Sequence, residues 1–90
     1  MRLTWRAMAC NDRLRIMEHI AQDNPQAALA EDERFDEKAR RAALSPYLYR
    51  AGRFPGTREI VIHPNYVMVF RVMEEYVEVI RILHARQQWP

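Results

Sequence analysis

The sequence predicts an α+β domain in which a short N-terminal strand, a two-helix hairpin and a three-stranded antiparallel meander follow one another, with the helices on one face of the sheet. Apolar residues recur at helical spacing in the first half of the chain, and short apolar runs between turn residues occupy the second half. No repeat, linker or low-complexity segment interrupts the 90 residues. A chain of this length is expected to form one domain, residues 1–90, with a thin core.

The first two elements follow from Leu3-Thr4-Trp5 and the residues after it. The tripeptide is β-prone, and a tryptophan so early in the chain is expected to pack, so a strand is predicted over residues 2–6. This strand must join the later ones. A helix is then predicted over residues 7–23, because its apolar residues share one stripe: Cys10, Leu14, Met17 and Ala21, with Ile20 alongside.

The second helix is predicted to run from Pro25 to about Leu44. Asn24 can accept hydrogen bonds from the first backbone amides, and proline suits the first helical position. Ser45-Pro46 ends the helix.

The inward stripe of this second helix contains a conflict. Positions 31 and 32, where an apolar residue is expected, are Glu31 and Asp32. An acidic residue there either lies at the edge of the core or faces a cation of a partner, since unpaired carboxylates are rarely buried. The other residues of the stripe are Ala28, Phe35, Ala39 and Ala42.

Residues 46–56 are predicted to be a loop, because they contain both glycines and two prolines. Strands are predicted over residues 58–62, 66–73 and 76–84, and the short connections between them require antiparallel neighbours. In the middle strand the bulkier side chains share one face and are expected to meet the helices: Tyr66, Met68, Phe70 and Val72. The second face, with Arg71 and Arg81, is expected to be partly open.

Composition excludes several classes of protein. Cys10 is the only cysteine and is expected to act as a small hydrophobe, and the three histidines have no zinc-site spacing. No glycine-rich phosphate loop, paired-carboxylate motif or catalytic-triad order is present. We therefore expect no metal and no cofactor. With no signal peptide and no apolar run of about 18 residues, a cytoplasmic protein outside the membrane is expected.

Basic residues are concentrated in the second half of the chain. Residues 1–37 contain five arginines against eight Asp or Glu, and residues 38–90 contain nine Lys or Arg against four Glu, so the net charges are −3 and +5. Thirteen of the fourteen cations are arginine, whose planar fork suits phosphate or carboxylate recognition, although a GC-rich genome produces the same bias.

One constellation of residues could carry chemistry. Metal-independent RNA cleavage requires a base, cationic stabilisation of the pentavalent phosphate and an acid for the leaving oxygen, which histidines and arginines can supply. The alternative is structural, with the arginines paired across strands to glutamates. The candidate residues are Arg58, His63, Arg71, Arg81, His84 and Arg86, together with Tyr66 and Trp89.

Several segments match the pattern of one protein family. They are Trp5, Asn24-Pro25-Gln26-Ala27-Ala28, Pro46-Tyr47-Leu48-Tyr49, Pro55-Gly56-Thr57-Arg58-Glu59-Ile60, Asn65-Tyr66-Val67-Met68-Val69-Phe70-Arg71-Val72 and His84-Ala85-Arg86-Gln87. In these segments the chain resembles the ParE/RelE superfamily of bacterial toxins, and its ParE branch in particular. Such toxins are small proteins made with an antitoxin that neutralises them. The last three segments together make the match specific.

The resemblance implies a molecular target. In the RelE-like ribonucleases, basic side chains recur at positions that match Arg58, Ile60 and Val67, and only the first is basic here. One lost donor of this kind commonly costs about 3 kcal/mol of transition-state stabilisation, so a ribosome-dependent mRNA endonuclease is disfavoured. The ParE branch poisons DNA gyrase by protein contact and has no catalytic centre. This is the preferred hypothesis, with the endonuclease as the alternative.

Three sets of site residues are expected under these hypotheses. Target binding is assigned to Arg58, Arg71, Arg81, His84, Arg86 and Trp89. The endonuclease alternative would use Arg58, His84, Arg86 and Tyr66. An amphipathic helix of a small, acidic, partly disordered antitoxin is expected to dock on the alanine-rich helical hairpin, through Ala28, Leu29, Ala39 and Ala42, and on Phe54. No sequence-specific DNA binding by the toxin alone is expected.

Overall fold

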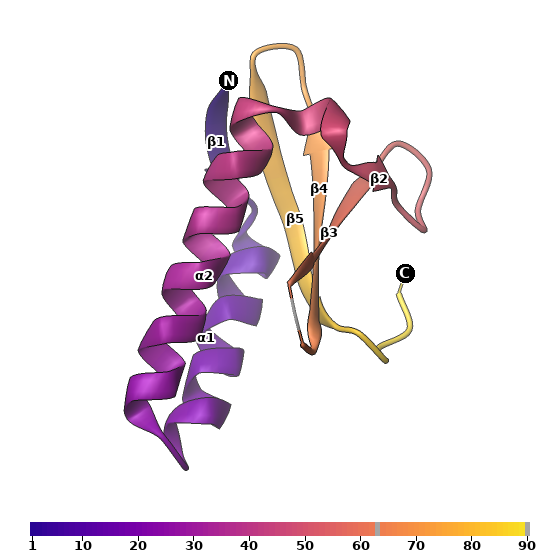
Figure 1. Cartoon of the computed structure of the whole chain (residues 1–90). Helices are drawn as coiled ribbons and strands as arrows, with labels where there is room; N and C mark the ends of the chain where they lie inside the picture. Colours follow the sequence, from indigo (N-terminus) through magenta and orange to yellow (C-terminus); the bar gives the residue numbers. More distant parts are fainter. Residues whose placement is uncertain (63, 90) are drawn as a thin grey trace.

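The structure is a computed structural model that describes residues 1–62 and 64–89. His63, one of the residues considered for RNA cleavage, lies outside them. The elements in chain order are β1 (Arg2–Trp5), α1 (Ala7–Ala21), α2 (Pro25–Leu44), the 3-10 turn η1 (Pro46–Leu48), β2 (Arg50–Ala51), β3 (Arg58–Ile62), β4 (Tyr66–Val72) and β5 (Tyr76–His84) (Figure 1).

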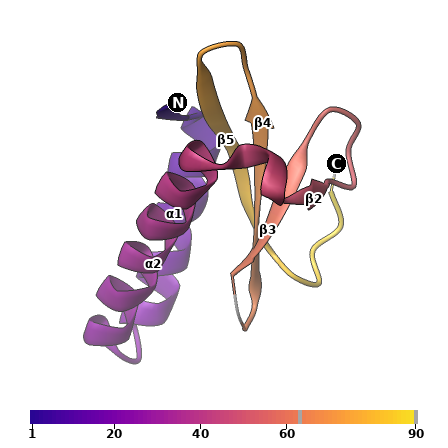
Figure 2. The same cartoon turned by 45° about the horizontal axis from the view of Figure 1, so that its top comes forward.

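The five strands form one sheet in the order β1-β5-β4-β3-β2. β1 pairs with β5 in parallel, and the other neighbours are antiparallel. The two helices lie side by side and cover one side of the sheet (Figures 1 and 2). This confirms the predicted α+β arrangement and the meander β3-β4-β5. The two-residue strand β2, at the edge of the sheet, was not predicted.

Helix α2 has the predicted ends. The Asn24 side chain accepts a hydrogen bond from the Ala27 backbone amide at 3.1 Å, and Pro25 occupies the first turn. At the other end the Ser45 amide donates to the Arg41 carbonyl, and Pro46 begins η1. Helix α1 ends at Ala21, two residues before the predicted end. Neither helix, among the described residues, combines the length and the apolar composition needed to cross a membrane.

The core lies between the helices and the sheet. Met68 and Phe70 belong to it, and Tyr66 and Val72 pack against it, so the predicted face of β4 does meet the helices. The inward stripe of α2 is also confirmed, and Glu31 is buried within it. The other residues of this core are Ala9, Phe35, Ala39, Ala42, Ala43, Ile60, Ile62, Val77, Val79 and Ile82.

The predicted inward stripe of α1 is wrong in its first half. Cys10 is exposed and Leu14 is 56% exposed, whereas Ala9 and Asp12 are buried and Ile16 packs against the core. The two stripes are neighbours on the helix, and counting apolar residues favoured the wrong one because the true stripe contains an aspartate. That aspartate can be buried because the sheet supplies its partners.

The second face of the sheet is partly open, as predicted, because Val61 is 54% exposed and Arg71 is half-buried, but much of it is covered. Val67, Val69 and Leu83 are 4% or less exposed. Both views place the segment after β5 and the loop between β2 and β3 on the side of the sheet away from the helices (Figures 1 and 2). The two segments are fastened together by an Arg53 Nη1 hydrogen bond to the Gln87 carbonyl (3.2 Å) and by the rings of Phe54 and Trp89, 5.7 Å apart.

Candidate functional site

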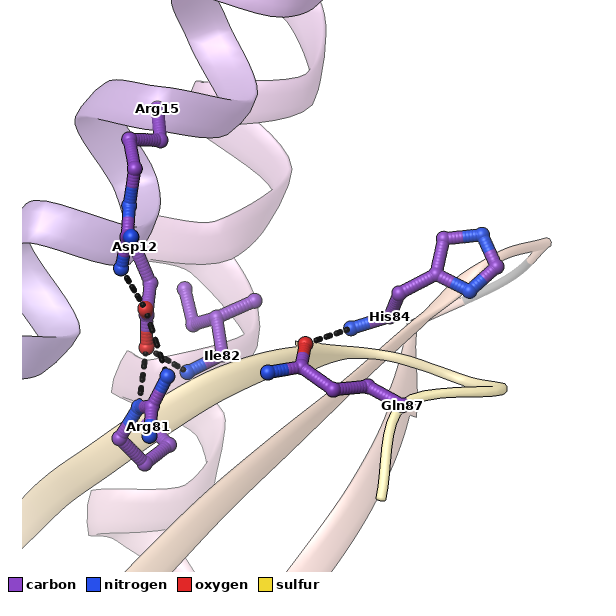
Figure 3. A network of polar contacts seen from close by, with 6 residues as sticks. All are labelled: Asp12, Arg15, Arg81, Ile82, His84 and Gln87. Atoms are coloured by element: carbon purple, nitrogen blue, oxygen red, sulfur yellow. Dashed lines mark hydrogen bonds and ion pairs between the residues drawn. The ribbon is translucent and has the colours of Figure 1, made fainter. Parts of the chain in front are cut away.

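The carboxylate of Asp12, on α1, accepts four hydrogen bonds at the junction between this helix and β5. It is 4% exposed. Its oxygens accept two hydrogen bonds from Arg81 (Nε at 2.7 Å and Nη2 at 3.1 Å), one from the Ile82 backbone amide (2.9 Å) and one from Arg15 (3.0 Å). Figure 3 shows the carboxylate between the two guanidinium groups. This bidentate pair fastens α1 to β5.

The pairing of β4 and β5 is irregular next to Arg81. Val69 is opposite Arg81 and Phe70 is opposite Val79, so Ile80 is an extra residue in β5. A bulge of this kind changes the direction of neighbouring side chains. The hydrogen bond to Asp12 raises the pKa of the Arg81 guanidinium. The negative charge of Asp12 also raises this pKa, whereas burial acts to lower it. Arg81, predicted to bind a target from an open face, is therefore buried in an ion pair.

A groove runs along the end of the sheet, between the helices and the ends of β4 and β5. It consists of two adjoining hollows of about 300 and 440 Å³, which share His19, Tyr66 and His84. The first hollow includes Asp12 and Gln87, and the second includes Glu31 and Asn65. We call this the hairpin groove.

Tyr66 is the aromatic centre of the hairpin groove. Its ring contacts Phe35 (5.6 Å between centroids) and His84, which is its cross-strand partner (5.9 Å). Burial, and secondarily the charge of Glu31, raises the pKa of the Tyr66 hydroxyl. The Arg86 amide donates to His84 Nδ1 at 3.2 Å, so this nitrogen already accepts a hydrogen bond. The His84 amide donates to Gln87 Oε1 (Figure 3).

Arg58 does not belong to this groove. It donates to the Tyr49 carbonyl at 2.7 Å, and its guanidinium lies over the Tyr47 ring at 5.0 Å. It is opposite Phe70 on β4, four positions from Tyr66, which corresponds to about 13 Å along the strand. The candidates for RNA cleavage are thus divided between two ends of the sheet.

Comparisons with known proteins identify the family of this chain. The family model described as "ParE toxin of type II toxin-antitoxin system, parDE" matches residues 3–89. The chain belongs to the ParE family of toxins. A relative from Sinorhizobium fredii (strain NBRC 101917 / NGR234), named "Putative toxin Y4kP", is 32% identical over 90 residues, which are 99% of this chain and 93% of that protein.

A solved structure shares the fold of this ParE-family toxin. It is described as "Chromosomal ParDE TA system from P. aeruginosa" and matches with a TM-score of 0.82 at 22% identity, over 93% of this chain and 95% of that one. The chain is accordingly a ParE-type toxin of a type II toxin-antitoxin system.

Three of the alanines that were expected to contact the antitoxin are not on the surface of this ParE-family toxin. Ala28, Ala39 and Ala42 are 2% or less exposed, because they pack inside the molecule rather than line a free surface. Leu29 is 60% exposed and Phe54 is 38% exposed, so these two remain accessible. Sequence reasoning missed the most exposed large apolar residues, Leu44 (80%), Tyr47 (67%) and Leu48 (83%), which cluster where α2 ends. Three large apolar residues within five positions, next to the predicted end of the helix, were the signal in the sequence that could have indicated this exposed apolar surface.

The loop that meets the C-terminal tail is organised by Glu59, on β3. Glu59 is 5% exposed, and its Oε2 accepts hydrogen bonds from the Arg53 backbone amide (2.8 Å) and from Arg53 Nε (3.0 Å). Burial acts to raise the pKa of Glu59, but these bonds, with the charges of Arg53 and Arg50, outweigh it and leave the pKa below its ordinary value. Arg53 also reaches Gln87, so Glu59 supports the contact between loop and tail.

Glu59 is expected to make the stability of the toxin depend on pH. Its pKa is lower in the folded chain, so its contribution is complete above the ordinary value of 4.5 and is lost as the pH falls through the folded value. Urea unfolding of the wild type and Glu59→Gln from pH 7 to 3 should show a gap that closes on acidification. Glu75→Gln, at an exposed pair, is the control. A gap that stays constant over this range would contradict the assignment.

Proposed function

We propose that this ParE-family toxin arrests bacterial growth by binding DNA gyrase through protein contacts, that it has no catalytic centre, and that an antitoxin neutralises it by direct binding. The observation that carries the proposal is the separation of the residues that catalysis would need. Arg58 is bonded to Tyr49 at one end of the sheet, and Tyr66 and His84 lie at the other. This separation supports binding, rather than catalysis, as the way in which the toxin acts.

The tail surface, which we define as Phe54, Arg86 and Trp89, is the proposed contact with gyrase. It combines the rings of Phe54 and Trp89, which contact each other, and the exposed cation Arg86. Aromatic residues and arginine dominate the binding energy of protein interfaces. From the sequence-predicted set, Arg86, His84 and Trp89 remain candidates. Arg71 is half-buried on the same side of the sheet as Val69.

The proposal is tested with purified toxin, gyrase and relaxed plasmid DNA. Toxin at micromolar concentration is expected to inhibit supercoiling and to trap the cleaved DNA complex, and prior addition of the antitoxin should prevent both effects. Unchanged supercoiling without a trapped complex would contradict gyrase as the target.

Variants of the tail surface are expected to separate binding from folding. Trp89→Ala should raise the half-inhibitory concentration about 30-fold, which corresponds to the roughly 2 kcal/mol of a central aromatic anchor. Arg86→Ala should have a smaller effect that diminishes with salt, since exposed charges act mainly on the association rate. Arg40→Ala, at an exposed pair on α2, is the control and should inhibit as the wild type does. Full inhibition by Trp89→Ala would remove the tail from the interface.

The endonuclease alternative has one observation in its favour, the contact between Tyr66 and His84 in the hairpin groove. A translation extract distinguishes the two functions. Message fragments that appear with the wild type and disappear with Arg86→Ala would support the enzyme, whereas intact message supports gyrase binding.

A further inference from the structure

Glu31 is a buried carboxylate that the fold does not satisfy. It lies on α2, is 9% exposed, and lines the larger hollow of the hairpin groove. Its Oε2 is 3.6 Å from Arg34 Nη1. Its Oε1 is buried and has no hydrogen-bond partner among the residues that the structure describes. Buried carboxylate oxygens normally accept hydrogen bonds, so this oxygen is available to a donor that enters the groove.

The residues around Glu31 indicate that the donor is a cation. A second acidic residue, Asp23, lines the same hollow, whose other polar residues include His19, Tyr66 and His84. The influence of Glu31 on the pKa of the Tyr66 hydroxyl reflects the negative potential there. Two carboxylates in one hollow disfavour an anion and favour a cation. No cluster of three or more His, Cys, Asp or Glu side chains with metal-binding geometry occurs among the described residues.

The hollow has the volume for a long basic side chain. Its volume of about 440 Å³ accommodates an arginine or lysine side chain with its aliphatic stem. A guanidinium would present its planar fork to the carboxylate, and the stem would pack beside Ile20 and Ala27, which also line the hollow.

We propose that the hairpin groove receives a basic side chain of the antitoxin, which hydrogen-bonds Glu31. The proposal rests on the proposed neutralisation by an antitoxin. In the proposed function the toxin is bound to its antitoxin while growth continues. A side chain that pairs with the antitoxin, such as Glu31, would therefore lack its partner in the free chain. A charge pair buried at an interface also slows dissociation, which a lasting neutralisation requires.

The decisive experiment compares free and bound toxin for Glu31→Gln and Glu31→Met. A buried carboxylate that lacks its partner destabilises the free chain. Both variants remove this charge, so both should melt at or above the wild-type temperature. The same variants should bind the antitoxin encoded beside the toxin at least about 30-fold more weakly. Asp23→Asn, at the rim of the groove, should change the affinity far less and is the matched control.

A double-mutant cycle identifies the partner residue. Each Arg and Lys of the antitoxin is replaced by Met in turn. One of these replacements should lower the binding affinity as much as Glu31→Gln does, and combining it with Glu31→Gln should lower the affinity no further. Wild-type affinity for Glu31→Gln, or a lower melting temperature without loss of binding, would overturn the proposal. If the wild-type toxin itself fails to bind the antitoxin, the proposed function fails instead. If gyrase inhibition depends on Glu31 and antitoxin binding does not, the groove belongs to the target and the proposal is wrong.

A small probe tests the site without any partner protein. Methylguanidinium, titrated into the full chain, should shift the NMR signals of the Tyr66 ring in the wild type and not in Glu31→Gln. Urea, a planar neutral molecule of similar size, should cause no such saturable shift. Equal shifts with methylguanidinium in both proteins would overturn the proposed receptor.

Discussion

Replacing Asp12 by alanine is expected to destabilise the folded chain by about 3–5 kcal/mol, because it leaves the guanidinium of Arg81 buried without its counter-charge. The change also removes the acceptor of the Ile82 amide. A domain of this size has about 5–15 kcal/mol of total stability, so much of it would be lost. Thermal unfolding should show a fall in midpoint of at least about 12 °C.

Two further variants isolate the buried pair as the cause. Asp36→Ala removes a surface carboxylate that pairs with Arg40, and it should cost no more than about 0.5 kcal/mol. The double variant Asp12→Leu with Arg81→Met removes both charges and should recover most of the lost stability, since an apolar pair can replace a buried ion pair. A loss below about 1 kcal/mol for Asp12→Ala would show that the bridge is unimportant.

Replacing Phe35 by alanine is expected to cost about 3–5 kcal/mol through the cavity that it leaves. Phe35 is fully buried on α2, and its ring makes a T-shaped contact with the ring of Tyr66. The loss should therefore also loosen the aromatic centre of the hairpin groove. Urea unfolding measures the stability, and the NMR linewidth of the Tyr66 ring reports the local effect.

The matched control for Phe35 lies on the same helix. Leu29→Ala removes a large apolar side chain that is 60% exposed, so it should change stability by less than about 0.5 kcal/mol. Similar losses for the two variants would mean that α2 does not pack on the sheet as described.

The elements predicted well from the sequence are those with local signals at their ends. Asn24-Pro25 and Ser45-Pro46 bound α2, and alternation between short turns determined the three later strands. What escaped prediction depends on residues far apart in the chain. Asp12 was not singled out from the sequence, because its partner Arg81 is 69 residues away.

The candidate site could be predicted only in part for the same reason. Alternation correctly placed Tyr66 on the helix side of β4, and a basic, aromatic tail was visible in the sequence. Alternation within one strand says nothing of what covers its other face, so the burial of Val67, Val69 and Leu83 was missed. The conflict at Glu31 was visible, but only burial of its side chain shows that it is more than peripheral.

The parallel pairing of β1 with β5 has a consequence for synthesis of the chain. Thr4 Oγ1 donates to the Val77 carbonyl, 73 residues later. Ribosomes add about 5–20 residues per second, so β1 waits about 4–15 s for its neighbour. During that time the nascent chain can form its helical hairpin but has neither the Asp12 bridge nor the tail surface. Translation itself therefore delays completion of the sheet until β5 has been made.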